Sequence, residues 1–215
     1  MTEPADALAP TLYGDLPSEA WPVGDDVTDE PWASFVRARR HVADGDQDLA
    51  LRAWVGVAAD ATLEARHRLQ AWHFLRSIGV NPDEAIAAEV WGVVAEVAVD
   101  DGHDVLAAYD VGGVRYLNHA GGVTVVDEVG GDAAEALAQW LAAGQQLAGH
   151  IGVWTEPTRP SLAVGESRMT MLTPGGPRFG QGPDDALRAD PMAGPLFAAA
   201  TALLVAVLSS TGGLG

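Results

Sequence analysis

The stretch GVVAEVAVDDGHDVLAAYDVGGVRYLNHAGGVTVVDE, residues 92–128, decides the fold of this chain. From Val93 to Val99, every second residue is a small apolar one that would lie on the same face of a strand. A period of two is typical of strands, because successive side chains point to opposite sides of a sheet. Glycine-containing dipeptides that favour hairpin turns interrupt the stretch at residues 101–102, 112–113 and 121–122. The pattern therefore predicts a four-stranded antiparallel meander over residues 91–128.

Helical patterns flank this stretch on both sides. Before it, apolar residues recur at helical spacing, including Trp32, Phe35, Val36, Val42, Trp54 and Ile78. The segment ADGDQD at 43–48 predicts a turn between two of these helices, and Gly79 ends a third. After the meander we expect a long helix from Asp132, a strand over 168–174 and an apolar helix near 192–210. These elements predict an α+β fold, with an N-terminal helical hairpin region followed by a four-stranded antiparallel meander with packed helices.

The chain divides into three predicted parts. Residues 1–27 are acidic, contain several prolines and show no period, which is typical of a disordered or loosely docked tail. Residues 28–80 form the helical region, and residues 81–215 form the α+β domain. We expect the helices of that domain to lie on one face of its sheet.

Charge and cysteine content narrow the classes of partner. The chain has 30 acidic and 12 basic residues, for a formal net charge of −18. This charge repels nucleic acids and anionic membranes, whereas it attracts basic partners. There is no cysteine, which excludes disulfides and thiolate chemistry and is consistent with a cytoplasmic location. The N-terminal sequence has no basic region followed by an apolar one, so we do not expect a signal peptide. The apolar run 196–208, at about 13 residues, is shorter than the roughly 20 that span a bilayer, so we expect a buried helix.

Two regions resemble known folds. The segment RARRHVADGDQDLALRAW, residues 37–54, resembles a tetratricopeptide-type helical pair. The resemblance covers about one repeat, without a second copy, and implies helix-hairpin packing and binding of a peptide or protein.

The C-terminal two-thirds of the chain is similar in outline to profilin-like or longin-like modules, although the order of elements departs from theirs. Three segments, at 69–76, 115–122 and 172–183, are similar to stretches of bacterial proteins of unknown function.

The segment VRYLNH concentrates residues that could carry chemistry: Arg115, Tyr116, Asn118 and His119. A histidine titrates near neutral pH and could act as a general base. Strand alternation would place His119 on the same face as Arg115 and Asn118 on the other face. Asn118 and His119 would then not bind one ligand together unless the strand ends or bulges there. We favour a structural His119. Asp127 and Glu128, across the last hairpin, are the nearest carboxylates that could orient its ring.

The segment GGPRFGQGP, residues 175–183, is the second candidate, with Arg178, Phe179 and Gln181 among four glycines. Glycines permit close approach of the backbone, so the loop could cradle an anion. It matches neither a Walker A loop nor a dinucleotide-binding fingerprint, and a structural loop is the favoured interpretation. The acidic turn at 100–104 lacks the spacing of a known metal motif. We predict no cofactor and no metal site.

Two functions remain as hypotheses. The first is a non-catalytic cytoplasmic protein-interaction or regulatory protein that binds a protein partner through the helical region or the sheet. An aromatic peptide groove between the N-terminal helices would serve this role, using some of the seven tryptophans. The alternative is a small enzyme or ligand-binding domain that uses the 115–119 strand and the 175–183 loop. The alternative requires both segments to meet in one concave pocket.

Overall fold

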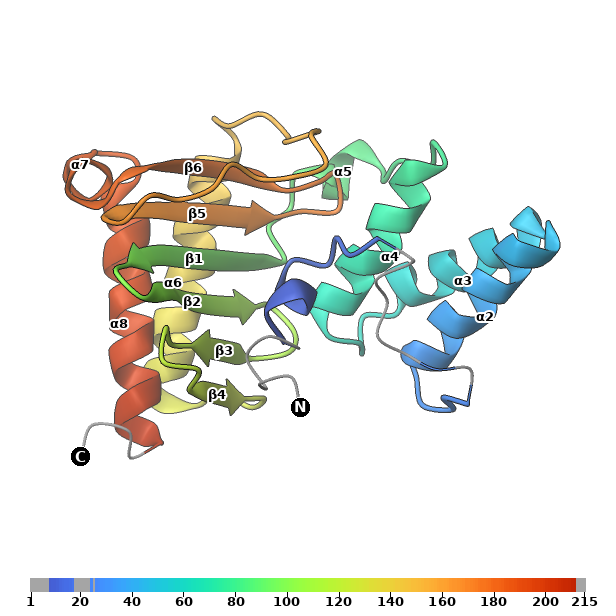
Figure 1. The fold of residues 1–215 in the computed structure, drawn as a ribbon, viewed down its shortest axis with the longest axis horizontal. Helices are drawn as coiled ribbons and strands as arrows, with labels where there is room; N and C mark the ends of the chain where they lie inside the picture. Colours follow the sequence, from blue (N-terminus) through green and yellow to red (C-terminus); the bar gives the residue numbers. More distant parts are fainter. Residues whose placement is uncertain (1–7, 18–23, 25, 212–215) are drawn as a thin grey trace.

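A computed structural model describes residues 8–17, 24 and 26–211 of the chain. A sheet forms its centre, two long helices cover one face, and a further helical region lies at one end of the strands (Figure 1). The helices are η1 (Ala9–Leu12), α2 (Trp32–Asp44), α3 (Gln47–Ala59), α4 (Ala65–Ser77), α5 (Glu84–Ala87), α6 (Gly131–Ala148), α7 (Asp184–Ala189) and α8 (Gly194–Ser210). The strands are β1 (Gly92–Val99), β2 (Gly102–Tyr109), β3 (Val114–Leu117), β4 (Val123–Val126), β5 (Glu166–Leu172) and β6 (Arg178–Pro183).

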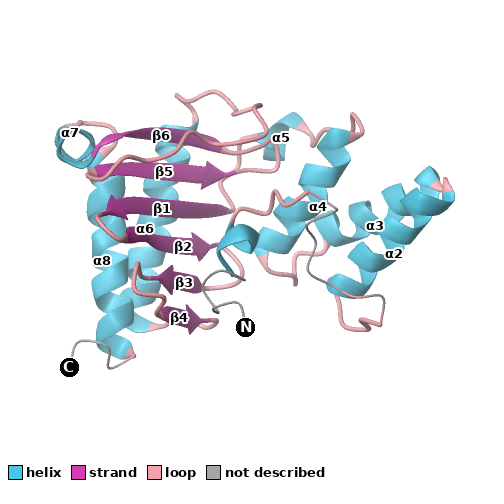
Figure 2. Cartoon of the chain, in the orientation of Figure 1, coloured by secondary structure: helices cyan, strands magenta, loops and turns pink. Residues whose placement is uncertain are grey.

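The sheet confirms the predicted meander and extends it. Its strand order is β4-β3-β2-β1-β5-β6, and every neighbouring pair is antiparallel (Figure 2). The sheet has six strands and not only the four of the meander, because β5, near the strand expected over 168–174, pairs with the free side of β1, with Met171 opposite Val93, and β6 pairs with β5. The turn between β2 and β3 depends on Gly113, which has a φ of +71° and lies so close to β4 that an added Cβ would be 2.0 Å from the Val126 carbonyl oxygen.

Helices α6 and α8 pack side by side against one face of the sheet. Trp140 of α6 and Leu203 of α8 are fully buried there, with Val93 and Met171 of the central strands. The prediction that the apolar C-terminal segment forms a buried helix is confirmed by this packing. Within the described residues, none of the helices is both long enough and apolar enough to span a bilayer.

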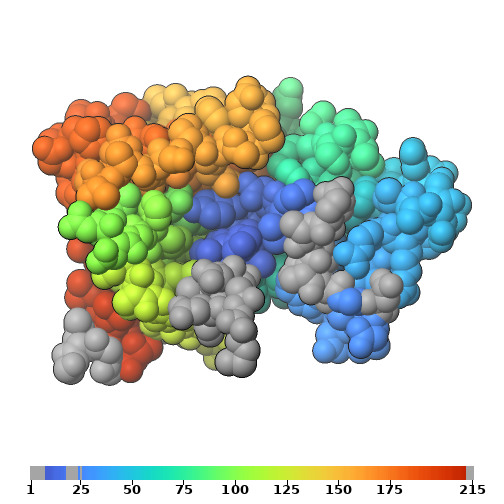
Figure 3. Space-filling model, viewed as in Figure 1, coloured from blue at the N-terminus to red at the C-terminus, as the bar shows by residue number. Residues whose placement is uncertain are grey.

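The opposite face of the sheet is covered by the N-terminal segment and by α4. Leu12 is fully buried, and its carbonyl oxygen accepts a hydrogen bond from the Tyr109 hydroxyl at 2.6 Å. The Gln70 amide of α4 bonds to the backbone N–H and carbonyl of Leu16, at 2.9 and 2.8 Å. In the space-filling view this segment fills the centre of the visible face (Figure 3).

The expectation for the N-terminal tail needs correction in part. Residues 8–17 are not part of a disordered tail, because buried apolar and hydrogen-bonded side chains hold them against the sheet. The rest of the predicted tail, residues 1–7, 18–23 and 25, lies outside the described residues. The two long helices of the predicted α+β domain, α6 and α8, lie on one face of the sheet as expected. On the other face, α4 of the helical region contributes Ala65 and Leu69 to the core.

The predicted helical region is present as α2, α3 and α4. Gly45, with a φ of +84°, ends α2 in the left-handed conformation and allows α3 to fold back along it. Phe35, Trp54 and Phe74 join the three helices in a core of their own. The α2–α3 hairpin extends beyond α4, away from the sheet (Figure 1). The domain boundary at residue 80 stays a prediction, because α4 contributes to the cores on both sides of it.

Candidate functional site

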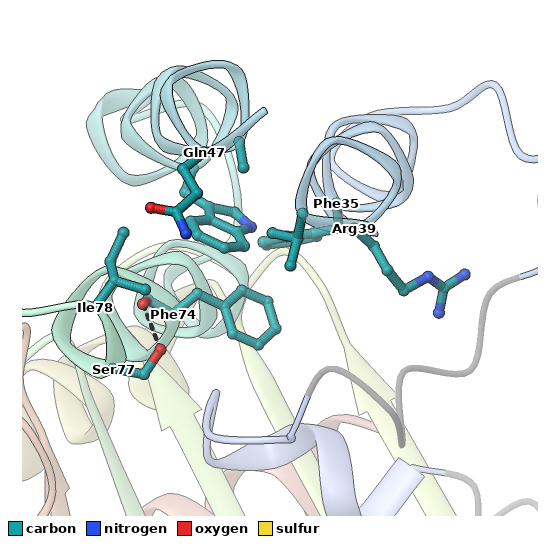
Figure 4. Close-up of a pocket in the computed structure, with 9 residues that line it drawn as sticks. Phe35, Arg39, Gln47, Phe74, Ser77 and Ile78 are labelled. Atoms are coloured by element: carbon teal, nitrogen blue, oxygen red, sulfur yellow. Dashed lines mark hydrogen bonds between the residues drawn. The ribbon is translucent and has the colours of Figure 1, made fainter. Parts of the chain in front are cut away.

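An apolar groove opens to solvent between α2, α3 and α4 (Figure 4). Its cavity has a volume of about 220 Å³. The lining residues are Phe35, Arg39 and Val42 of α2; Gln47, Ala50 and Trp54 of α3; and Phe74, Ser77 and Ile78 from the end of α4. On each helix these residues are three or four positions apart, so each helix presents one face to the same cavity.

Three aromatic rings form the floor of the groove. The ring of Phe74 meets Phe35 edge-on, with centroids 5.9 Å apart, and lies 5.4 Å from the ring of Trp54. All three side chains are buried. Because edge-on and tilted ring pairs pack favourably and buried rings have few alternative rotamers, the floor is a preformed apolar surface.

The rim of the groove exposes large apolar side chains. Val42 and Ile78 are 49% and 52% exposed, although both lie beside the aromatic floor. The Ser77 hydroxyl donates to the Phe74 carbonyl oxygen at 2.7 Å, so its polar group is satisfied within α4 (Figure 4). The Arg39 guanidinium points away from the cavity (Figure 4). The inner surface of the groove is therefore mainly apolar.

Charged residues of both signs surround the groove, with Arg39 in its lining and aspartates near its α3 side. Gln47 is the first residue of α3 and lines the groove, and three exposed aspartates, Asp44, Asp46 and Asp48, lie within three positions of it in the sequence. Among the described residues, no acid or histidine lines the cavity itself. A site with this composition can bind an apolar side chain, but its described lining offers no acid–base pair for catalysis.

The residues predicted from the segment VRYLNH have structural partners in most cases. Arg115 is only 3% exposed and donates to Asp127 at 2.7 Å and to Glu64 at 3.3 Å. It also donates to the carbonyl oxygens of Val114 and Val126, at 3.1 and 3.4 Å. Arg115 thus joins β3 and β4 to the start of α4, with no exposed face for a ligand.

Asn118 and His119 lie beyond the end of β3, at Leu117, so strand alternation does not govern them. The Asn118 side-chain oxygen accepts from the backbone N–H of Ala120 and Gly122, at 3.1 and 2.8 Å, and so closes the turn before β4. Nδ1 of the His119 ring lies 2.8 Å from a carboxylate oxygen of Asp104 on β2.

Asp104 also joins His119 to Tyr116. It accepts the His119 backbone N–H at 2.8 Å and the Tyr116 hydroxyl at 3.3 Å. Burial, together with the Asp104 charge, raises the pKa of Tyr116. The expectation that Asp127 or Glu128 would orient His119 is wrong, because β2 supplies the carboxylate and Asp127 pairs with Arg115.

The residues predicted from the glycine-rich segment lie on β6. Arg178 donates to the carbonyl oxygens of Ala148 and Ile151, at 3.1 and 2.5 Å, at the end of α6. The ring of Phe179 lies 4.9 Å from that of Trp154, and the side-chain oxygen of Gln181 is buried without a partner among the described residues.

These two groups of predicted residues do not meet. The sheet order places β2, β1 and β5 between β3 and β6. At about 4.8 Å per strand, β3 and β6 are therefore roughly 19 Å apart. The single pocket that the enzyme hypothesis requires is absent from the described part of the chain, since its two halves lie toward opposite edges of one sheet.

The groove itself was only partly visible in the sequence. The helical pattern named Phe35, Val42, Trp54 and Ile78 as apolar stripe residues, whereas Arg39, Gln47, Ala50, Phe74 and Ser77 carried no signal. The sequence signal that could have indicated the groove is that Val42 and Ile78 extend the apolar stripes to the ends of their helices. Trp54 is the only groove residue among the tryptophans that the structure describes.

Comparison of the chain with protein-family models, with curated proteins and with solved structures finds no match in any of the three.

Proposed function

We propose that this protein is a non-catalytic interaction protein that binds a partner polypeptide in the groove between α2, α3 and α4. The observation that carries the proposal is an open cavity with a buried aromatic floor and a rim of exposed apolar side chains. Exposed apolar surface of this kind is costly in water and is typical of sites that bind another molecule. A cytoplasmic location is part of the proposal, supported by the lack of cysteine in the sequence.

The size and charge of the groove define the partner's chemistry. A cavity of about 150 Å³ holds a benzene molecule, so the 220 Å³ groove is large enough for one phenylalanine or leucine side chain. The net charge of −18 and the aspartates of the α2–α3 turn favour a partner with basic residues beside that side chain. The proposed ligand is thus a basic segment with one bulky apolar residue, which lies across the three helices.

Binding of defined peptides tests this function. The probe is a fluorescent peptide of about twelve residues with a central phenylalanine among lysines and alanines, and its pair has alanine at the centre. Fluorescence polarisation should show tighter binding of the phenylalanine peptide. Binding that is equal for the two peptides, or absent for both, would contradict the proposal.

Matched variants locate the binding in the groove. Val42→Gln and Ile78→Gln replace rim residues that are about half exposed, and Val205→Gln replaces a residue of α8 that is 53% exposed. Each groove variant should weaken the phenylalanine peptide about fivefold, which is roughly 1 kcal/mol and suits the partial burial of one aliphatic side chain. The Val205 variant should bind as the wild type does. Equal weakening by all three would show nonspecific apolar binding and would refute the assignment to the groove.

A further inference from the structure

A second cavity lies on another face of α4, next to its C-terminal end. Its volume is about 450 Å³. Its lining includes Asp15, His73, Arg76, Asn81, Trp154 and Arg159, together with the first residues of the glycine-rich segment, Gly175–Pro177. His73 and Arg76 are three positions apart and so share a face of α4. We refer to this cavity as the Arg76 cleft.

Arg76 is a partly buried cation without an anionic partner. Its guanidinium donates to the carbonyl oxygen of Pro174, but no carboxylate among the described residues lies within ion-pair distance. Burial lowers the pKa of Arg76 to about 10, so it is still charged at neutral pH. The more deeply buried Arg115 and Arg168 each pair with a glutamate or aspartate, as does the partly buried Arg66. Arg178, which is partly buried like Arg76, instead donates to two carbonyl oxygens at the end of α6. A guanidinium has five N–H donors, and within the described residues Arg76 uses its donors only on Pro174.

The Asp15 charge acts on Arg76 and opposes the effect of burial on its pKa, but Asp15 does not form an ion pair with it. Asp15 pairs with Arg159, whose guanidinium also lies 4.0 Å from the centre of the Tyr13 ring. Burial lowers the pKa of His73, and the charges of Arg76 and Arg159 lower it further against the opposing charge of Asp15. His73 is therefore neutral at pH 7. Glu156 also lines the cleft, where it is exposed and forms no ion pair with Arg76 or Arg159.

The glycine-rich turn shapes the cleft without binding through its backbone. The N–H groups of Gly175 and Gly176 donate to the carbonyl oxygens of Ala87 and Thr173, both at 2.9 Å. At Gly176, where φ is +128°, an added Cβ would lie 2.6 Å from Val153. The turn is thus a fixed wall, and any anion in the cleft is held by side chains.

We propose that the Arg76 cleft binds a small organic anion whose carboxylate or phosphate group pairs with the Arg76 guanidinium. A buried cation is costly unless an opposite charge accompanies it, and the planar guanidinium matches two oxygens of either group. The volume of the cleft lies in the range of about 300–1,000 Å³ that is typical of small-molecule sites. The described lining carries two arginines, Arg76 and Arg159, and two carboxylates, Asp15 and Glu156. Because Asp15 already pairs with Arg159, Arg76 is the cation to which an anion would bind.

An NMR titration of the ¹⁵N-labelled protein tests the proposal. Sodium phosphate and sodium benzoate are added separately at constant ionic strength, with sodium chloride as the reference. The readouts are the indole N–H of Trp154 and the backbone amide of Gly176, which both line the cleft. We expect saturable shifts at both positions with one of the two anions, and the more effective anion identifies phosphate or carboxylate as the bound group. Shifts that chloride reproduces, or no saturable shift with either anion, would overturn the proposal.

Variants with matched charge changes assign the binding to Arg76. Arg76→Gln should weaken the anion at least tenfold, whereas Arg52→Gln, which removes an exposed cation of α3, should leave affinity unchanged. Arg76→Lys retains the charge and a donor for Pro174 but not the two-pronged geometry, so it should bind measurably more weakly than the wild type even if the Gln variant fails to fold. Undiminished binding by the Lys variant and by a folded Gln variant would refute the role of Arg76. The groove peptides are expected to bind between α2, α3 and α4, in a different cavity from the Arg76 cleft, and are measured separately, so the two proposals can fail independently.

Discussion

His67 of α4 is a buried histidine whose charge should make stability depend on pH. Its side chain is 6% exposed, its Nε2 has no hydrogen-bond partner among the described residues, and its ring meets that of Trp32 edge-on at 4.9 Å. Burial lowers the pKa of His67 to about 4, and the charges of Arg66 and Arg115 add to this effect while Glu64 opposes it. The folded protein therefore keeps His67 neutral at pH values where an unfolded chain protonates it.

The sign and size of the effect follow from proton linkage. The unfolded chain, with a histidine pKa near 6.5, binds more protons than the folded chain between about pH 6.5 and pH 4. The stability that comes from the neutral His67 is thus fully present above pH 6.5 and is lost as the pH falls toward 4. For a folded pKa of about 4, the His67 contribution costs about 2 kcal/mol on going from pH 8 to pH 5.

Urea unfolding of wild type and His67→Phe at pH 8 and pH 5 measures this contribution. At pH 8 His67 is neutral in both states, so the difference between the proteins there reports packing alone. Carboxylates and the other histidines titrate in both proteins and cancel in the comparison. We expect the variant to lose about 2 kcal/mol less than wild type between the two pH values. An equal loss in both proteins would refute the argument that burial keeps this ring neutral.

Three further substitutions test the fold. Gly113→Ala should lower the free energy of unfolding by at least about 2 kcal/mol, because a Cβ is unfavourable at its positive φ and would overlap a carbonyl oxygen of β4; Gly130→Ala, where no atom lies within 4 Å of the added Cβ, should cost far less in the same urea measurement. Tyr109→Phe should cost about 1–3 kcal/mol and speed amide exchange across residues 8–17, since it leaves the buried Leu12 carbonyl without its donor; unchanged exchange there would contradict the docking role. His119→Gln should lower the free energy of unfolding by at most about 1 kcal/mol and leave peptide binding intact, because the His119 side chain that pairs with Asp104 is 45% exposed. Loss of binding without loss of stability would favour a functional role for His119.

The meander was predictable because its signals are local. Alternation within β1 and glycines at each turn are read from neighbouring residues, and the structure confirms both. The pairing of β5 with β1 joins Val93 to Met171, far apart in the sequence, and depends on shape and burial that no local pattern encodes. Residues 8–17 were misread for the same reason. Their composition suggested a tail, whereas a distant partner, Tyr109, holds them in place.

The candidate site shows a similar limit. Alternation was extended from β3 to His119 although the strand ends at Leu117, so the true partner, Asp104, was missed. In the helical region, the spacing of Phe35 and Trp54 indicates only that they face inward. Whether three inward faces close completely or leave a groove depends on how the helices cross, which is a tertiary property.

The place of β1 in the sheet has a consequence for the growing chain. Residues 92–126 can form their meander early in synthesis, but β1 then has one free edge until residues 166–172 emerge. A free edge of backbone donors and acceptors invites pairing with other chains, and a charged side chain on it discourages such pairing. Glu96 is the only charged residue between Gly92 and Val99. When β5 arrives, Arg168 takes the position opposite Glu96 and pairs with it at 2.7 Å. The same carboxylate thus protects the unfinished edge and then marks the correct register for the strand that covers it.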